Sequence, residues 1–342
     1  MLSDNKLLKT DFCVLTDDVV HNNEIFRKGG EILRNGGLVA FPTETVYGLG
    51  ANALSEEAVS KIFKAKGRPQ DNPLIVHIAD LSDLESLVKK IPKKAEIIAN
   101  HYWGGPITII MERSDKIPAS VSAGLSTVAI RFPSHPVATA LIKLSGVPIA
   151  APSANLSGKP SPTTARHVAE DMMGRADVII DGGSSFFGVE STVLDATVSP
   201  LAILRPGAVT REELSELLHE EVVWGGGDGV PKSPGMKYKH YAPAAPLYII
   251  ESKDPVQVIN SLSDEKTGVL AYGIDPSEFT AGVVFSAGNT PSEYAAHMFY
   301  YLREFDNCGV DKIYAVAPPP GGVGDAVRNR IFKSAGGKVI CE

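Results

Sequence analysis

Phe41 to Ile78 reads FPTETVYGLGANALSEEAVSKIFKAKGRPQDNPLIVHI, and this stretch predicts a strand, a polar corner, a helix and a second strand. The apolar run up to Phe41 predicts a buried strand, which Pro42 ends. Ser55 begins a helix with two glutamates in its first turn, and Gly67 is suited to stop it in a left-handed conformation. The unit closes with the buried strand Leu74–Ile78.

Two cations follow the predicted helix in a loop stiffened by two prolines. Lys66 stands at the helix end, and Arg68 lies two residues later, next to Pro69. A lysine at a helix C-terminus is usually explained by the helix dipole, which contributes a few tenths of a kcal/mol. That explanation fits Arg68 less well, because its backbone is already beyond the helix. A fixed arginine and lysine together favour a site for a polyphosphate or a carboxylate.

Length and composition limit the class of protein. A chain of 342 residues with 44% hydrophobic and 21% charged residues is typical of a globular protein with two domains. A net charge of −7 argues against a strongly cationic nucleic-acid binder, although a local basic groove stays open. The cysteines Cys13, Cys308 and Cys341 form neither a metal-spaced pair nor an even disulfide set, which favours the cytoplasm. No apolar run is long enough to cross a membrane, so we expect no membrane contact.

Strands and helices alternate along the rest of the chain, which predicts an α/β protein. Besides the opening unit, the expected strands of the first domain include Ile107–Met111, Thr127–Arg131, Gly146–Pro152, Asp177–Ile180, Glu190–Asp195 and Ala202–Gly207. The second domain is expected to hold the strands Leu247–Ile250, Gly268–Tyr272, Val283–Phe285 and Lys312–Ala317. Helices alternate with them, notably at Ser292–Asn307 and Ala326–Ala335, so we expect the strands to be parallel. We therefore expect one domain over residues 14–223 and a smaller α/β domain over residues 247–342.

Residues 224–246, which we call the strap, join the two domains. The segment is too rich in glycine and proline for a packed element, yet it carries Tyr238, His240 and Tyr241. Aromatic and cationic side chains are costly in a mere spacer. We therefore expect an ordered strap that covers a neighbouring surface, with a solvated tether as the alternative.

Further polar groups stand at strand ends. Arg131 shares one face of its strand with Thr127, and Arg205 ends another strand. For a lone arginine the common alternative is a surface salt bridge. Ser153 and Asn155 follow a buried strand, where small polar groups let a ligand approach, although simple turn chemistry also explains them.

Two other kinds of site are disfavoured. Gly48–Ala53 fits a relaxed dinucleotide fingerprint, but six residues separate it from the preceding strand, and Asp80 lies about thirty residues on, where about twenty is usual. An oxidoreductase is thus a weak alternative. No histidine pair has zinc-like helical spacing, so we expect no metal site built from protein side chains.

The chain resembles the threonylcarbamoyl-AMP synthases, the YrdC-like proteins, in the longer form with an appended C-terminal domain. The marks, in the family's order, are FPTETVYGLG, KAKGRPQDNPLIVHI, the strand ending in Arg131, APSANLSG, ESTV, ILRPG and SPGMKYKHYAP. The resemblance implies a large twisted mixed-sheet YrdC-like domain and a smaller Rossmann-like α/β C-terminal domain. It also implies synthesis of threonylcarbamoyl-adenylate and pyrophosphate from L-threonine, bicarbonate and ATP, a nucleotidyltransferase reaction that feeds modification of transfer RNA.

The family's functional residues map onto matching positions. By resemblance, Lys66 and Arg68 are catalytic. The residues expected to bind ATP are Lys66, Arg68, Asn72, Thr127, Ser153, Asn155, Ser161, Arg205 and His240. Those expected to bind L-threonine are Thr45, His77, Arg131, Ala151 and Ser191.

The resemblance also implies cofactors and partners. Mg²⁺ is expected to arrive on the ATP phosphates, which matches the lack of a visible carboxylate cage. The product is expected to pass to the transfer-RNA threonylcarbamoyl-transfer machinery. A structured-RNA-binding module that uses the same cations remains the alternative function, and weak RNA contact stays open.

Overall fold

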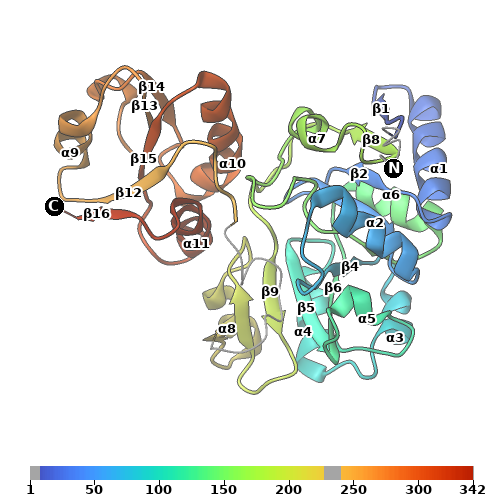
Figure 1. Cartoon of the computed structure of the whole chain (residues 1–342). Coiled ribbons are helices and arrows are strands. Elements are labelled where there is room, and N and C mark those ends of the chain that lie inside the picture. Colours follow the sequence, from blue (N-terminus) through green and yellow to red (C-terminus); the bar gives the residue numbers. More distant parts are fainter. Residues whose placement is uncertain (1–7, 227–239, 342) are drawn as a thin grey trace.

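The computed structural model describes residues 8–226 and 240–341. Within these residues the chain forms two α/β domains, each built on its own sheet (Figure 1). The first sheet has eleven strands in the order β1-β8-β2-β3-β7-β4-β6-β5-β9-β10-β11, and the second has five in the order β14-β13-β15-β12-β16. This architecture confirms the predicted fold class.

The first domain carries a mixed sheet with helices around it. Its strands are β1 (Asp11–Val14), β2 (Val39–Phe41), β3 (Gly48–Asn52), β4 (Ile75–His77), β5 (Ile107–Glu112), β6 (Thr127–Arg131), β7 (Ile149–Ala150), β8 (Val178–Asp181), β9 (Thr192–Asp195), β10 (Ala202–Arg205) and β11 (Val223–Trp224). Its α-helices are α1 (Val19–Arg34), α2 (Glu56–Lys66), α3 (Leu84–Leu87), α4 (Lys93–Tyr102), α5 (Ala119–Ser122), α6 (Pro136–Ser145), α7 (Ala165–Met172) and α8 (Arg211–Leu218), with a 3₁₀ turn at Leu81–Asp83. Parallel pairs such as β4–β6 alternate with antiparallel pairs such as β5–β6.

The opening unit differs from its prediction at one point. Helix α2 begins after the N-cap Ser55 and ends at Gly67, whose φ of 60° is left-handed, as predicted. Between the polar corner and this helix, however, Gly48–Asn52 forms β3, antiparallel to β2. The corner is thus the turn of a β-hairpin. Prediction missed the strand because its glycines read as a turn.

Helix α1 contains two glycines, Gly29 and Gly30, although glycine has a low helix propensity. A Cβ atom on Gly30 would lie 2.9 Å from the backbone carbonyl carbon of Leu144, and one on Gly29 would lie 2.7 Å from the Leu141 side chain. Glycine is therefore required for the close packing of α1 on α6. This packing, and not intrinsic helix propensity, stabilises α1.

The second domain has a fully parallel sheet in the described residues. Its elements are β12 (Leu247–Glu251), α9 (Pro255–Leu262), β13 (Thr267–Ala271), a 3₁₀ turn at Pro276–Glu278, β14 (Val283–Ser286), α10 (Pro291–Cys308), β15 (Lys312–Val316), α11 (Val323–Ala335) and β16 (Val339–Cys341). Every strand pair in it is parallel, as predicted. The prediction omitted β16, whose three residues are too few for a clear pattern.

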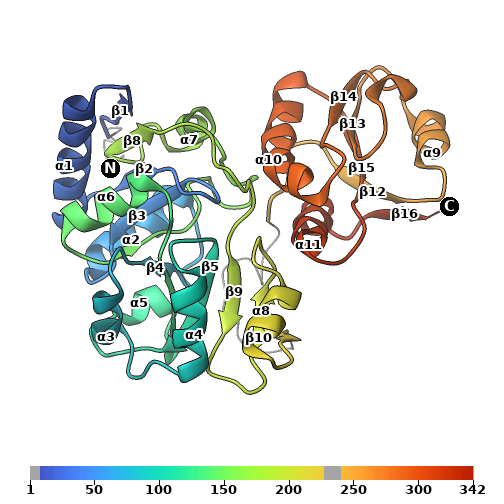
Figure 2. The ribbon, with the colours of Figure 1, turned by 180° about the vertical axis from the view of Figure 1, so that it is seen from behind.

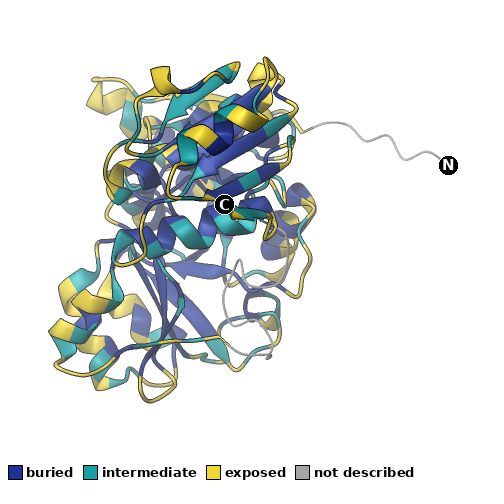
Figure 3. Cartoon of the chain, turned by 90° about the vertical axis from the view of Figure 1, so that its left-hand side faces the viewer, coloured by how far each residue is buried: buried dark blue, intermediate teal, exposed yellow. Residues whose placement is uncertain are grey.

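The inner strands of both sheets are mostly buried, whereas the edge strands β1, β11, β14 and β16 are partly exposed (Figure 3). Helices α10 and α11 lie on the side of the second sheet that faces the first domain (Figures 1 and 2). The apolar core of the second domain extends across the interface to Val46, Val189 and Tyr241. A Cβ atom on Gly188 would lie 2.3 Å from the carbonyl oxygen of Ala295, so α10 packs directly on this loop.

Some predicted boundaries need correction. The strand predicted over Gly146–Pro152 is reduced to β7, and Glu190 and Ser191 precede β9 instead of belonging to it. Trp224, the first residue of the strap, pairs with Ile203 in β11. Strap residues 227–239 lie outside the described residues, so the structure tests the predicted cover only at its end. No described helix is both long and apolar enough to span a membrane.

Candidate active site

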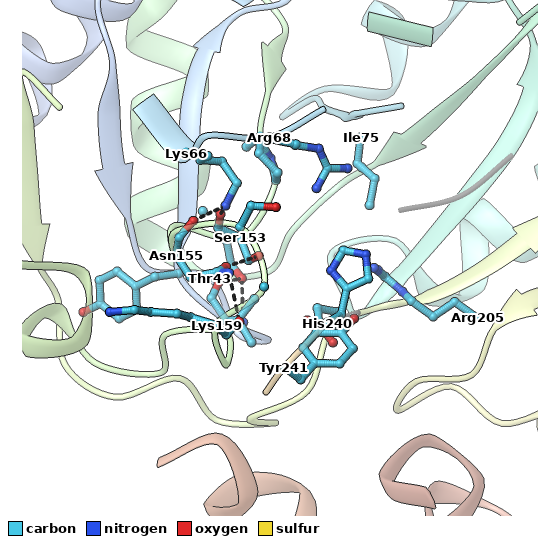
Figure 4. A pocket seen from close by; sticks show the side chains of 18 of the residues that line it. Thr43, Lys66, Arg68, Ile75, Ser153, Asn155, Lys159, Arg205, His240 and Tyr241 are labelled. Carbon is cyan, nitrogen blue, oxygen red and sulfur yellow. Dashed lines mark hydrogen bonds between the residues drawn. The ribbon is translucent and has the colours of Figure 1, made fainter. Parts of the chain in front are cut away.

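A cavity opens where the hairpin, α2, the loop after β7 and the described end of the strap meet. We call it the central cavity, and the space between its walls is about 710 Å³, including the part open to solvent. It is lined by Thr43, Val46, Tyr47, Gly48, Lys66, Arg68, Ile75, His77, Arg131, Ala151, Pro152, Ser153, Asn155, Ser157, Gly158, Lys159, Glu190, Arg205, His240 and Tyr241. Cations from separate segments of the chain thus line one space, and Figure 4 shows Lys66, Arg68, Lys159 and Arg205 around it.

Lys66 ends α2 and is buried. Its ammonium donates hydrogen bonds to the backbone carbonyls of Ser153 and Asn155, and it points toward that loop in Figure 4. Burial, together with the charge of Arg68, lowers the pKa of Lys66 well below its usual value. The lysine therefore ties the helix end to the loop and brings polar groups of both to one side of the cavity.

Arg68 is held in the loop beyond α2 by the backbone. Its Nη2 donates to the carbonyl of Pro73 at 3.1 Å and more weakly to that of Asn72 at 3.4 Å. Burial, with the nearby charge of Arg205, lowers the pKa of Arg68 to about 10, so it stays charged at neutral pH. A half-buried, charged and backbone-positioned guanidinium is suited to bind phosphate.

Arg131 reaches the cavity from the end of β6 and contacts the polar corner. Its Nη2 lies 2.7 Å from Glu44 Oε1 and 2.9 Å from Thr45 Oγ1. The Thr45 hydroxyl lies 2.9 Å from that of Thr43, and Glu44 also accepts from the amide of Ser134 at 3.2 Å. The surface salt bridge considered as the alternative for Arg131 is therefore wrong, because the guanidinium is buried.

Arg205 lines another part of the cavity and is held there by Ser191, which lies behind the wall. Its Nε donates to the carbonyl of Ser191 and its Nη2 to the Ser191 hydroxyl, both at 3.1 Å. The Ser191 hydroxyl also lies 2.8 Å from that of Thr108. Burial lowers the pKa of Arg205 to about 10, and Glu190 opposes this shift. This arginine is thus also charged at neutral pH.

Both histidines of the site are neutral at pH 7. Burial, with the charge of Arg131, lowers the pKa of His77 to about 3. Burial, with the charge of Arg68, lowers the pKa of His240 to about 4. In Figure 4 the His240 ring lies beside Arg205, so the described end of the strap reaches the cavity.

Several polar atoms in this region lack a partner. Among the described residues, Arg68 Nε, Asn72 Oδ1, Arg131 Nε and His240 Nε2 are buried without a hydrogen bond. Leaving such an atom unpaired costs about 1–3 kcal/mol. Their concentration around one cavity indicates a polar ligand that bonds with them.

The structure places most of the predicted site residues on or directly behind the cavity wall. Thr45 and Ser191 lie one contact behind it, through Arg131 and Arg205. Ser161 lies behind Glu190, to which its hydroxyl donates at 2.6 Å. Thr127 is the exception, because it stands at the other end of β6, opposite Glu112, and does not line the cavity. Its assignment to ATP stays a prediction.

Sequence reasoning missed Glu44, Lys159, Glu190 and Tyr241 as site residues. Glu44 and Glu190 lie inside the family motifs and directly precede the predicted site residues Thr45 and Ser191. Their position next to these residues is the signal that could have identified them. Lys159 lies on the wall and binds Asp171 at 2.9 Å. In the part of the chain that the structure describes, no group of three or more His, Cys, Asp or Glu residues is placed to hold a metal ion.

The fold and the cavity define a two-domain α/β protein with a cavity lined by lysine and arginine side chains. Comparisons make this class specific. The model of a family described as telomere recombination, which groups Sua5, YciO and YrdC proteins, matches residues 31–207, and a model described as the C-terminal domain of threonylcarbamoyl-AMP synthase matches residues 209–336.

Full-length relatives agree with this result. The threonylcarbamoyl-AMP synthase of Pyrococcus abyssi is 48% identical over 320 residues, which cover 90% of this chain and 93% of the relative. That of Bacillus subtilis is 47% identical over 340 residues, covering 96% and 98%. The crystal structure of P. abyssi Sua5 complexed with L-threonine has a TM-score of 0.90 at 44% identity and covers 97% of this chain and 99% of that chain. The chain belongs to the threonylcarbamoyl-AMP synthase family, in its two-domain form.

Proposed function

We propose that this protein is a nucleotidyltransferase that forms threonylcarbamoyl-AMP and pyrophosphate from L-threonine, bicarbonate and ATP. The observation that carries the proposal is the convergence of Lys66, Arg68, Arg131 and Arg205 on one cavity. The reaction brings a carboxylate, a carbamate and a triphosphate together, and these anions repel one another. Buried cations positioned in advance offset that repulsion.

The proposed chemistry has two steps. The threonine amine adds to carbon dioxide derived from bicarbonate and loses a proton, which gives a carbamate. A carbamate oxygen then attacks the α-phosphorus of ATP, and the bond to the bridging oxygen of pyrophosphate breaks. No side chain forms a covalent bond with substrate in this scheme, so the residues act by binding, orientation and charge.

The two ends of the cavity suit different substrates. Arg131, Thr45 and neutral His77 provide a small polar site for the amino and carboxyl groups of threonine, and the relative from P. abyssi was crystallised with L-threonine. Lys66, Arg68 and the loop carrying Ser153 and Asn155 suit the nucleotide. Arg205 lines another part of the cavity and would stabilise the leaving pyrophosphate.

Magnesium enters this proposal as part of the MgATP substrate. The cavity wall offers hydroxyls and cations, and its one carboxylate among the described residues, Glu190, is already bonded to Ser161 and Arg330. This donor set does not fit a metal held by protein ligands. We further propose that the protein works in the cytoplasm and passes its product to the enzyme that modifies transfer RNA.

The first test is pyrophosphate release from ATP with each amino acid, with and without bicarbonate. We expect release that depends on both L-threonine and bicarbonate. Arg68→Ala should reduce kcat by about 100-fold or more, the range expected when one preorganised charge partner is removed. Arg211→Ala is the control, because Arg211 lies on α8 and pairs with its neighbour Glu212. Normal turnover by the folded Arg68→Ala protein would refute the role of this cation.

The RNA-binding alternative is disfavoured by burial. Lys66, Arg131 and Arg205 are 2%, 4% and 5% exposed, whereas a phosphate backbone needs cations on an open groove. Salt-sensitive RNA binding without threonine-dependent pyrophosphate release would reverse this conclusion.

A further inference from the structure

One side chain of the second domain contacts residues that form the wall of the central cavity. Arg330 lies on α11 and is fully buried. Its Nε donates to Glu190 Oε2 at 3.0 Å, and its Nη1 donates to the carbonyl of Pro206 at 2.6 Å. Its Nη2 also lies 3.4 Å from the backbone carbonyl of Glu190. All three of these acceptors belong to the first domain.

The two segments that Arg330 grips carry predicted substrate contacts. Pro206 directly follows Arg205, and Glu190 directly precedes Ser191. Arg205 in turn holds Ser191 through its carbonyl and its hydroxyl. Arg330 therefore clamps together the end of β10 and the start of β9, where the two segments meet at the cavity.

Glu190 connects Arg330 with the rest of the wall. Its other oxygen, Oε1, accepts from the Ser161 hydroxyl at 2.6 Å. Burial would raise the pKa of Glu190, but the charges of Arg330 and Arg205 outweigh burial and lower the pKa to about 2. The carboxylate is thus an anion at working pH and lies within the electrostatic reach of both arginines.

Because the Glu190 carboxylate is buried and charged, it needs the Arg330 guanidinium as its counterion. With Arg330 present, the Glu190 carboxylate is bonded to Arg330 and Ser161, and the Arg205 guanidinium bonds to Ser191 at the cavity wall. Without Arg330, a buried carboxylate would be left without its main ion-pair partner, which is strongly unfavourable. Arg205, Tyr241 and Lys333 all lie within electrostatic reach of Glu190. An ion pair with Arg205, the cation on the cavity wall, would draw that guanidinium away from phosphate.

We propose that Arg330 is a positioning residue of the active site, supplied by the C-terminal domain, which neutralises Glu190 and so keeps Arg205 and Ser191 in place for the substrates. The proposal rests on the function proposed above and deepens it. The C-terminal domain is then an obligatory part of the catalytic centre.

The test compares Arg330→Met with a matched control on the same helix. Arg328→Met removes an arginine whose partners, Glu251 at 2.7 Å and the carbonyl of Pro318, lie within the second domain. We expect Arg330→Met to lower kcat by about 100-fold at an unchanged far-UV circular dichroism spectrum, and Arg328→Met to retain kcat within about twofold. A folded Arg330→Met protein with normal kcat and KM would overturn the proposal.

A double variant separates positioning from plain stabilisation. Arg330→Met combined with Glu190→Gln removes the charge that would capture Arg205, so we expect it to recover at least tenfold of the lost kcat. If Arg330 only supports the fold, the double variant will be no more active than Arg330→Met, which would refute the proposal. Should Arg330→Met not fold, Arg330→Gln, which also removes the charge, is compared in the same way with the double variant Arg330→Gln and Glu190→Gln.

Binding of inorganic pyrophosphate, measured by calorimetry, keeps this test independent of the proposed reaction. We expect the wild-type protein to bind pyrophosphate at least tenfold more tightly than Arg330→Met. If that difference holds but threonine-dependent turnover is absent, the proposed function fails and the positioning role stands. If the two proteins bind pyrophosphate equally and the wild type shows threonine-dependent turnover, the proposed function stands and the positioning role of Arg330 is refuted.

Discussion

Arg131 illustrates how one buried charge can be kept in a protein interior. Its guanidinium is 4% exposed, and removing such a group from water costs several kcal/mol unless partners compensate. Glu44 and Thr45 supply that compensation through Nη2, while Nε has no protein partner. The guanidinium is therefore held through Nη2, and its Nε–H group can donate a hydrogen bond to a carboxylate.

Burial of neutral histidines predicts a loss of stability in acid. Burial, with the charges of Arg303 and Arg166, lowers the pKa of His167 from its ordinary value of 6.5 to about 3. Between these values the unfolded chain binds a proton that the folded chain does not. The contribution is thus complete above about pH 6.5 and is lost as pH falls toward 3, by at most about 1.4 kcal/mol per pH unit for each such group.

We expect His167→Gln to reduce the slope of unfolding free energy against pH between pH 6.5 and 5. The reduction is at most about 1.4 kcal/mol per pH unit, which corresponds to one proton. Urea unfolding at a series of pH values measures this slope. Thr163→Val is the control, because it changes a buried neighbour without removing a titrating group. An unchanged slope in His167→Gln would show that folding does not lower the pKa of this histidine.

Among the elements, β3 shows why a strand can be invisible in sequence. Its residues GLGAN have low strand propensity, but the space around them leaves little choice. A Cβ atom on Gly50 would lie 2.7 Å from a ring carbon of Phe41 and 2.8 Å from the Ile149 side chain. The strand therefore exists because neighbouring strands pack over small residues.

We expect Gly50→Ala to lower the free energy of unfolding by about 1–3 kcal/mol, the usual cost of overpacking a core. Thermal and urea unfolding would measure the effect. Gly48→Ala on the same strand is the control, because its Cβ would lie at an ordinary 3.5 Å from Ala151. Equal stability of the two variants would mean that the Phe41 ring can move aside.

In the whole molecule, the two domains are joined by buried arginines as well as by apolar contacts. Arg303 on α10 donates to Asp171 at 2.6 Å and to the carbonyl of Pro160 at 2.7 Å, both in the first domain. Asp171 also binds Lys159, which lines the central cavity. Domain docking and the shape of the site are therefore linked at two separate places, through Arg303 and Arg330.

We expect Arg303→Met to destabilise the protein by about 3–5 kcal/mol, since it leaves Asp171 buried without its main partner. Differential scanning calorimetry should show a lower and less cooperative transition. Arg166→Met is the control: Arg166 also reaches across the interface, to Glu304, but its side chain is 55% exposed. A surface pair of that kind contributes about 1 kcal/mol or less. Similar losses in both variants would contradict the assigned role of burial.

Much of the local structure was predictable, because it depends on neighbours in sequence. The caps of α2 at Ser55 and Gly67 were read from residue types, and the structure confirms them. The site motifs were predictable for a related reason, since each is a short run of residues around one strand end. Glu190 was not, because its role depends on Arg330, which lies 140 residues away.

By itself, the sequence of this protein determined which segments are helices, where most strands lie and which cations are available for anionic ligands. These properties follow from periodicity, capping and charge over a few residues. Only the tertiary structure decided that β3 is a strand, that Arg131 is buried, and that an arginine of the second domain supports the wall of the first domain's site. Those outcomes depend on packing and on ion pairs between distant segments, whose energies no local pattern contains.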